Sequence, residues 1–229
     1  MPLNLPHNLP AIDILSKEHI FVMSDLRAST QDIRPLKIAI LNLMPLKITT
    51  ETDLIRLLSN SPLQIEIDFV QLETHFPKNT PIEHLMEFYK PFSIIKKNFY
   101  DGFIVTGAPV ELIPFEEVNY WQELKDIFNW AQTHVTSTFY ICWAAQAAMY
   151  HFYGINKYPL EKKLFGVFKH NINDPSFPLF RGFDDEFYVP HSRHTTVCID
   201  EIEKHPELTI LSQSDEAGVY IISSRGGRE

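Results

Sequence analysis

Hydrophobic and polar positions alternate along residues 37–150 in a pattern that predicts strands and helices in turn. Short apolar runs are typical of strands buried in a parallel sheet, whereas apolar positions three or four residues apart indicate one face of a helix. A Thr at position 49 or 50 is a suitable N-cap for the first helix. The predicted strands are 37–43, 64–70, 101–107 and 137–142, and the predicted helices are 50–58, 81–89, 118–134 and 143–150.

This alternation predicts an α/β fold with an open, mostly parallel sheet and helices on both faces. After Gly154 the pattern changes to short strands, which we expect to form an antiparallel extension of the same domain; they lie at 165–169, 187–190, 195–199, 208–211 and 219–222. Three prolines among the first ten residues favour an extended surface arm over 1–34. The predicted organisation is therefore an N-terminal arm, 1–34, and one domain, 35–229.

Length, charge and cysteine content limit the classes of protein to which this chain can belong. A chain of 229 residues suits one α/β domain, and a net charge of -9 disfavours general binding to nucleic acid. Two cysteines exclude a disulfide framework and a zinc site of four thiolates. The sequence has neither a secretory signal pattern nor an apolar run of the roughly 18–20 residues needed to span a bilayer. We therefore expect a cytoplasmic protein without nucleic-acid or membrane partners.

Cys142 lies where a predicted buried strand meets a predicted helix. Ligands bind at the carboxyl ends of strands in such sheets, and unpaired N–H groups at a helix N-terminus lower the pKa of a thiol. The position corresponds to a nucleophile elbow, with the backbone N–H of Trp143 as the oxyanion donor. The alternative is a buried cysteine that only packs, which is the stronger interpretation for Cys198 within its strand.

A cysteine nucleophile needs a base, which is most often a histidine. His191 and His194 lie in a predicted loop, and they lack a third residue at a spacing diagnostic of a metal site, so no metal is predicted. His134 and His151 come at the ends of predicted helices, where a cation suits the helix dipole. The sequence has no G-x-G-x-x-G, Walker A or H-E-x-x-H motif, which disfavours a P-loop kinase or a dehydrogenase with the Rossmann fingerprint.

Segments along almost the whole chain carry a resemblance to one family, and together, in order and at family-like spacing, they are highly specific. They are 34–38, 41–45, 56–64, 103–109, 134–138, 142–146, 181–185 and 190–193. The chain resembles the homoserine O-acyltransferases of methionine biosynthesis, which use acetyl-CoA or succinyl-CoA. This resemblance implies the flavodoxin-like fold of class I glutamine amidotransferases.

The resemblance also implies a mechanism. Cys142 takes the acyl group from an acyl-CoA as a thioester, and the γ-hydroxyl of L-homoserine then attacks it. Lys163 and Ser192 match positions that contact substrate, and Lys47 matches a basic position suited to a CoA phosphate or an oxyanion. For each of these three residues the alternative is a solvated surface side chain. The resemblance implies acetyl-CoA as a co-substrate, no permanently bound cofactor, and a homodimer.

Glu111 matches the position that sets the acyl donor in this family. A glycine there leaves room for succinyl, whereas a glutamate fills the space and places its carboxylate against that of succinyl, which is costly in a partly dry pocket. Glu111 therefore predicts a homoserine O-acetyltransferase, with the O-succinyltransferase as the alternative. A loop glutamate without effect is the other interpretation.

The family's catalytic base is a histidine in a Gly-His-Pro-Glu-Tyr-like segment, and no residue after Ser224 matches that segment. We therefore expect the domain 35–229 to be incomplete at its C-terminal end relative to the family. His191 and His194 match a different segment, so the role of base is not transferred to them. Two further hypotheses remain open: a cysteine amidotransferase or hydrolase-like domain, and an inactive truncated paralogue.

Overall fold

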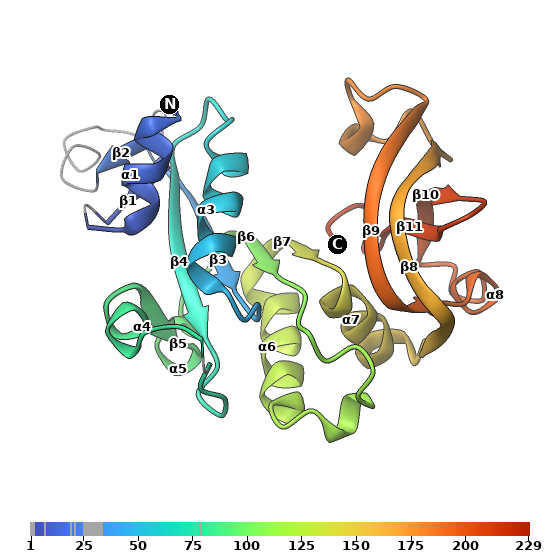
Figure 1. Cartoon of the computed structure of the whole chain (residues 1–229), viewed down its shortest axis with the longest axis horizontal. Coiled ribbons are helices and arrows are strands. Elements are labelled where there is room, and N and C mark those ends of the chain that lie inside the picture. Colours follow the sequence, from blue (N-terminus) through green and yellow to red (C-terminus); the bar gives the residue numbers. More distant parts are fainter. Residues whose placement is uncertain (1–2, 7, 19, 21, 25–33, 78) are drawn as a thin grey trace. The chain divides into compact units, whose positions relative to one another are not determined.

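The computed structural model of this protein describes residues 3–6, 8–18, 20, 22–24, 34–77 and 79–229 (Figure 1). The chain forms two compact units. Unit 1 comprises Met1–Pro109 and Glu116–Ala144, and unit 2 comprises Val110–Phe115 and Ala145–Glu229. Each unit is built on its own sheet. Within the described ranges, no helix combines the length and the apolar character that a membrane span requires.

Unit 1 contains a parallel sheet with the strand order β2-β1-β4-β3-β6-β7, and β5 pairs with β4. All of these pairings are parallel, as the alternating pattern predicts. The strands are β1 (Leu3–Leu5), β2 (Val22–Ser24), β3 (Leu36–Leu41), β4 (Ile65–Gln71), β5 (Tyr89–Pro91), β6 (Tyr100–Val105) and β7 (Val135–Tyr140).

Helices connect these strands, so the predicted α/β fold is confirmed. They are α1 (Pro10–Lys17), α3 (Lys47–Leu58), α4 (Ile82–Phe88), α5 (Phe92–Ile95), the 3-10 turn η1 (Phe115–Glu117), α6 (Trp121–His134) and α7 (Trp143–Tyr153), which continues from unit 1 into unit 2. Thr49 and Thr50 do not cap α3, because the helix begins at Lys47 and the Thr50 hydroxyl donates within it to the Leu46 carbonyl at 3.2 Å.

The N-terminal residues differ from the predicted extended surface arm. In the described part of 1–34, β1 pairs with β4, and Leu5, Leu9 and Leu15 are buried in the core of unit 1. Pro10 occupies the first position of α1, where its fixed φ suits a helix and its missing N–H breaks no bond. Proline here starts a packed helix, and the apolar residues of that helix supply the burial; Pro2 lies outside the described residues.

Unit 2 contains an antiparallel sheet with the strand order β11-β10-β8-β9, which confirms the antiparallel pairing predicted for the strands after residue 154. Its strands and short helices are β8 (Lys157–Ile172), η2 (Pro178–Phe180), β9 (Glu186–Val197), α8 (Ile199–Ile202), β10 (Thr209–Ser214) and β11 (Gly218–Ser223). Met149, Ile155 and Ile202 form its buried cluster.

Strand β9 is longer than predicted. The separate strands predicted at 187–190 and 195–199 are largely one strand, and the loop predicted at 190–194 lies inside it. Pro190 is tolerated because β9 is an edge strand of this sheet, where a missing N–H need not break the ladder. Its register with β8 places Pro190 opposite Val167. Ile199 begins helix α8 instead of ending a strand.

Candidate active site

Cys142 occupies the tight turn between β7, which ends at Tyr140, and α7, which begins at Trp143. Its side chain is exposed, and its φ of 55° lies in the left-handed region, which is unusual for a residue with a Cβ. Such strained backbone is common where a nucleophile is presented on a strand-to-helix turn. The predicted position of Cys142 at this turn is confirmed, whereas its catalytic role stays a prediction.

The backbone around the turn is tied to the neighbouring strand end. The Ile141 N–H donates to the Val105 carbonyl at 2.9 Å, and the Ala144 N–H donates back to the Ile141 carbonyl at 3.1 Å. Trp143, the predicted oxyanion donor, is the first residue of α7, and its buried indole lies edge-on to Tyr120 with ring centroids 6.2 Å apart. This packing fixes the helix start that carries the Trp143 N–H.

Gly107 is a part of the site whose role sequence reasoning did not predict. A Cβ at this position would lie 3.2 Å from the Cys142 Cβ and 3.7 Å from its Sγ. A side chain at 107 would therefore press on the cysteine. The only sequence signal was a glycine at the end of a buried strand, which by itself did not identify its neighbour.

The carboxyl ends of β3, β6 and β7 are held side by side at this edge of the sheet. The Thr106 N–H donates to the Leu41 carbonyl at 3.1 Å, and the Thr106 hydroxyl accepts from the Leu43 N–H at 2.8 Å. Thr106 precedes Gly107, so the same short segment contacts the end of β3 on one side and Cys142 on the other. Residues that follow β3 are thereby anchored to the edge that presents the cysteine.

Lys47 lies just after β3, and the structure contradicts its alternative interpretation as a solvated surface residue. It is the first residue of α3 and is only 6% exposed, and its Nζ donates to the Asn42 carbonyl. Burial lowers the pKa of Lys47 to about 8, although the Glu51 carboxylate opposes this shift. The predicted contact of Lys47 with substrate stays a prediction.

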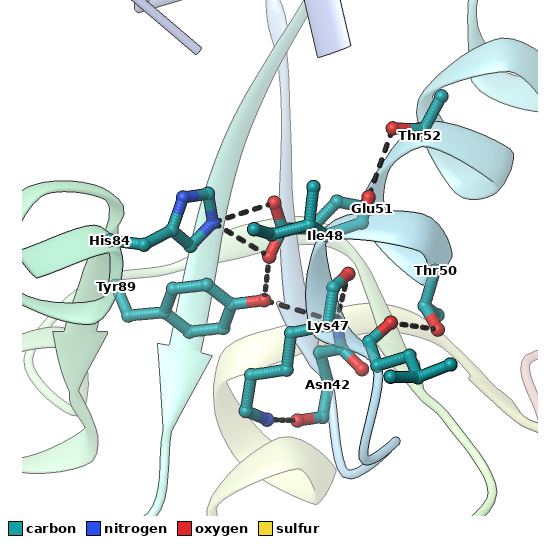
Figure 2. Close-up of polar contacts among 9 residues, drawn as sticks. Asn42, Lys47, Ile48, Thr50, Glu51, Thr52, His84 and Tyr89 are labelled. Atoms are coloured by element: carbon teal, nitrogen blue, oxygen red, sulfur yellow. Dashed lines mark hydrogen bonds and ion pairs between the residues drawn. The ribbon is translucent and has the colours of Figure 1, made fainter. Parts of the chain in front are cut away.

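A buried polar network surrounds Lys47, and sequence reasoning missed it. Figure 2 shows His84 and Tyr89 directed at the Glu51 carboxylate. The His84 Nε2 lies 2.9 Å from Glu51 Oε2, and the Tyr89 hydroxyl donates to Glu51 Oε1 and accepts from the Asn42 amide at 3.0 Å. The pKa of Tyr89 is raised well above its usual range, first by burial and then by the Glu51 charge.

One sequence signal could have found this network. Lys47, Glu51 and Ile55 follow one another at intervals of four residues, and all three are buried on one face of α3. Two charged residues on the apolar side of an amphipathic helix are unusual, because buried charges need partners.

Glu111 is held by β9 within unit 2. Its Oε2 accepts from the His194 N–H at 2.9 Å and lies 3.4 Å from the Thr195 hydroxyl. The Thr195 hydroxyl also lies 3.0 Å from the Gln146 side-chain oxygen on α7. These contacts do not fit a loop glutamate that is free in solvent; the effect of Glu111 on donor choice stays a prediction.

Lys163 and Ser192 are brought together by the pairing of β8 and β9. Ser192 is opposite Phe165, and the Lys163 Nζ lies 5.5 Å from the centroid of the Phe165 ring. Both side chains are exposed, so each can reach a ligand. Ser192 belongs to a strand, and the predicted loop at this position is wrong because the ladder with β8 continues through it.

His191 is also part of β9 and does not lie in a loop as predicted. Its Nε2 lies 3.1 Å from the His170 Nε2, and the two rings are stacked with an interplanar angle of 8°. Burial, followed by the charge of Arg193 and by His170, lowers the pKa of His191 to about 4. Within the described ranges, no group of three or more potential metal ligands comes together.

Comparison with known proteins decides the family. A family model described as homoserine O-succinyltransferase matches residues 2–229. The chain belongs to this family. The homoserine O-acetyltransferase of Parabacteroides distasonis is 67% identical over 100% of this chain and 74% of its own length. The homoserine O-acetyltransferase of Bacteroides fragilis is 65% identical over 100% of this chain and 75% of its own length.

Solved structures support the fold of this homoserine O-succinyltransferase family member. A glutamine amidotransferase from Thermotoga maritima matches with a TM-score of 0.57 at 13% identity, covering 86% of this chain and 74% of that one. The glutaminase domain of Trypanosoma brucei CTPS matches with a TM-score of 0.57 at 12% identity, covering 84% and 82%. At these identities the likeness concerns the fold alone, and it confirms the amidotransferase-like fold expected from the resemblance.

Proposed function

We propose that this chain carries the homoserine O-acetyltransferase activity for which its relatives are named. The observation that carries the proposal is the exposed Cys142 on a left-handed strand-to-helix turn in a member of this family. The turn presents the thiol beside the first backbone N–H of α7. This is the arrangement that covalent acyl transfer needs, because the nucleophile and an oxyanion donor come from adjacent residues.

The reaction has two steps. The Cys142 thiolate attacks the acetyl carbonyl of acetyl-CoA, the Trp143 N–H stabilises the oxyanion, and the CoA thiolate leaves. The γ-hydroxyl of L-homoserine then attacks the acetyl thioester, loses its proton to a base, and releases Cys142 and O-acetyl-L-homoserine. His191 is unsuited to be that base, because a pKa of about 4 makes it a weak proton acceptor near neutral pH.

The other side chains fit supporting roles. We propose that Lys163 and Ser192 contact substrate from the exposed face of the β8–β9 pair. Lys47 supplies a cation at the strand edge near the end of β3, where it favours a developing oxyanion or a CoA phosphate. These interactions orient the acyl donor and leave the chemistry to Cys142.

Acetyl is preferred over succinyl in this proposal because of Glu111. Its carboxylate is held by β9, and a succinyl carboxylate brought close to it would meet a fixed like charge. The alternative is the homoserine O-succinyltransferase activity that the family model's description names. The two activities differ only in the acyl donor, so donor competition separates them.

Mass spectrometry tests the covalent step. After incubation with acetyl-CoA, the protein gains one acetyl group, and Cys142→Ala abolishes the gain. Cys198→Ala is the matched control and keeps it, since Cys198 is the other cysteine of the chain. An undiminished acetyl gain in Cys142→Ala would rule out the thioester.

A second experiment tests the donor, on the enzyme expressed from its complete coding sequence. The ratio of kcat/KM for acetyl-CoA to that for succinyl-CoA is compared among the wild type, Glu111→Gly and Glu111→Gln. We expect the ratio to fall most in Glu111→Gly, which removes both bulk and charge, and less in Glu111→Gln. The exposed Glu117→Gln is the control and leaves the ratio unchanged. A wild type that prefers succinyl-CoA would refute the acetyl assignment.

The remaining parts of the proposal concern the setting of the enzyme. We propose a cytoplasmic homodimer that uses L-homoserine and acetyl-CoA as substrates and holds no permanently bound cofactor. Sedimentation of the purified enzyme, together with its activity after exhaustive dialysis against a chelator, tests the oligomeric state and the cofactor requirement.

A further inference from the structure

We propose that Thr195 is a positioning residue for donor specificity, which it controls by holding the Glu111 carboxylate. This inference rests on the proposed acetyltransferase function. It adds a second residue, on strand β9, to the one that the family resemblance connects with the acyl donor. The feature that the site distinguishes is the end of the acyl group: acetyl ends in a methyl group, whereas succinyl ends in a carboxylate.

The first argument is the set of contacts. Glu111 Oε2 faces two donors from adjacent residues of β9, the His194 N–H at 2.9 Å and the Thr195 hydroxyl at 3.4 Å. The backbone donor is present whatever the residue at 194. Of these two contacts to Glu111, a change of side chain on β9 can therefore remove only the one made by the Thr195 hydroxyl.

The second argument is the burial of Thr195. It is only 2% exposed, so its hydroxyl cannot rely on water and takes its partners from the protein. Its two neighbours are Glu111 Oε2 at 3.4 Å and the Gln146 side-chain amide, whose oxygen lies 3.0 Å away. Thr195 thus stands between the segment that carries Glu111 and helix α7. Its single proton goes to Glu111 when the Gln146 amide turns its NH2 group toward the Thr195 oxygen.

The third argument is what donor discrimination requires. A glutamate has several rotatable bonds, and a carboxylate that swings into water repels a second carboxylate only weakly, because water screens both charges. A carboxylate held at one place by two donors keeps its charge where the donor's acyl end must fit. Removing the Thr195 hydroxyl loosens that placement and so admits succinyl more readily.

The test compares the acetyl-CoA to succinyl-CoA ratio of kcat/KM in the wild type, Thr195→Val and Thr195→Ser, on the enzyme expressed from its complete coding sequence. We expect Thr195→Val to lower the ratio roughly tenfold, on the scale of one lost hydrogen bond to a charged group. Thr195→Ser keeps the hydroxyl and keeps the ratio. Thr196→Val is the matched control on the same strand and leaves the ratio unchanged. A poorly folded fraction does not affect the outcome, since it lowers both rates equally.

A double mutant distinguishes action through Glu111 from a direct effect. In the Glu111→Gly background, Thr195→Val is expected to change the ratio by less than twofold, because the carboxylate that it positions is gone. An equal effect of Thr195→Val in both backgrounds would overturn the inference. If Glu111→Gly shifts the ratio and Thr195→Val does not, this inference alone fails; if Glu111→Gly has no effect either, the proposed role of Glu111 fails with it.

Discussion

Glu51 is the residue whose removal is expected to destabilise unit 1 most clearly. Its carboxylate is 1% exposed and lies within the buried network of Figure 2. Glu51→Leu keeps a side chain of similar size and removes both oxygens. The hydroxyl of Tyr89 and the ring nitrogen of His84 then lose a buried acceptor, and the buried Lys47 loses a nearby negative charge.

The magnitude follows from these contacts. A hydrogen bond to a charged group contributes about 1.5–3 kcal/mol, and two such bonds end on Glu51. Removing one partner of a buried ion pair costs about 3–5 kcal/mol in other proteins. We therefore expect Glu51→Leu to lower the free energy of unfolding by about 3–5 kcal/mol. Glu51→Gln keeps one oxygen for Tyr89 and is expected to lie between Glu51→Leu and the wild type.

Urea unfolding followed by circular dichroism measures this loss. Asp53→Leu is the matched control on the same helix: its side chain is 62% exposed, and its ion pair with Arg56 is at the surface. Surface pairs of this kind contribute about 0–1 kcal/mol, so the control should change stability little. If Glu51→Leu were as stable as Asp53→Leu, the buried network would contribute nothing and the reasoning would be refuted.

Three further predictions concern other residues. The pKa of Lys47 is 10.5 in the unfolded chain and about 8 in the folded protein. Between these pH values the unfolded state binds more protons, so the free energy of unfolding rises with pH, by about 3 kcal/mol in total. Urea titrations at several pH values should show a smaller rise in Lys47→Met than in the wild type. An identical rise in the two proteins would contradict the lowered pKa of Lys47. Gly107→Ala is expected to slow acetylation of Cys142 by roughly 10- to 100-fold in timed mass spectrometry, because its Cβ would lie 3.2 Å from the cysteine Cβ. Gly102→Ala, whose Cβ meets only ordinary contacts from 3.5 Å, is the control, and equal rates in the two variants would contradict the close approach of residue 107 to Cys142. His191 should keep the NMR shifts of a neutral imidazole at pH 5.5 and titrate near pH 4, whereas a midpoint at 6.5 would show that burial does not lower its pKa.

The sequence was sufficient for the parts of the molecule that local pattern controls. Apolar runs separated by amphipathic segments predicted the parallel sheet, because a strand buried on both faces must be apolar throughout. The same pattern placed Cys142 between a strand and a helix, as the structure confirms. The resemblance carried by short segments along the chain then named the family correctly.

The sequence-based predictions were wrong where tertiary packing outweighed the local conformational preference of a residue. The three prolines near the N-terminus predicted an exposed arm, but Leu5, Leu9 and Leu15 are buried in the core of unit 1. The Pro190 segment looked like a loop, yet its pairing with β8 continues through it, because an edge strand accommodates a proline. In both cases packing against distant residues outweighed the local preference of proline.

In the candidate site, too, some features follow from local sequence and others from tertiary packing. The sequence by itself determined the fold class, the turn that presents Cys142 and the residue types available for acyl transfer, since these depend on periodicity within short windows. Only the tertiary structure decided which side chains meet. Glu111 contacts residues 83 and 84 positions away on β9, and Glu51 contacts His84 from a distance of 33 positions. Such pairings follow from strand register and helix packing, which arise when the whole chain buries its apolar surface, and no local spacing specifies them.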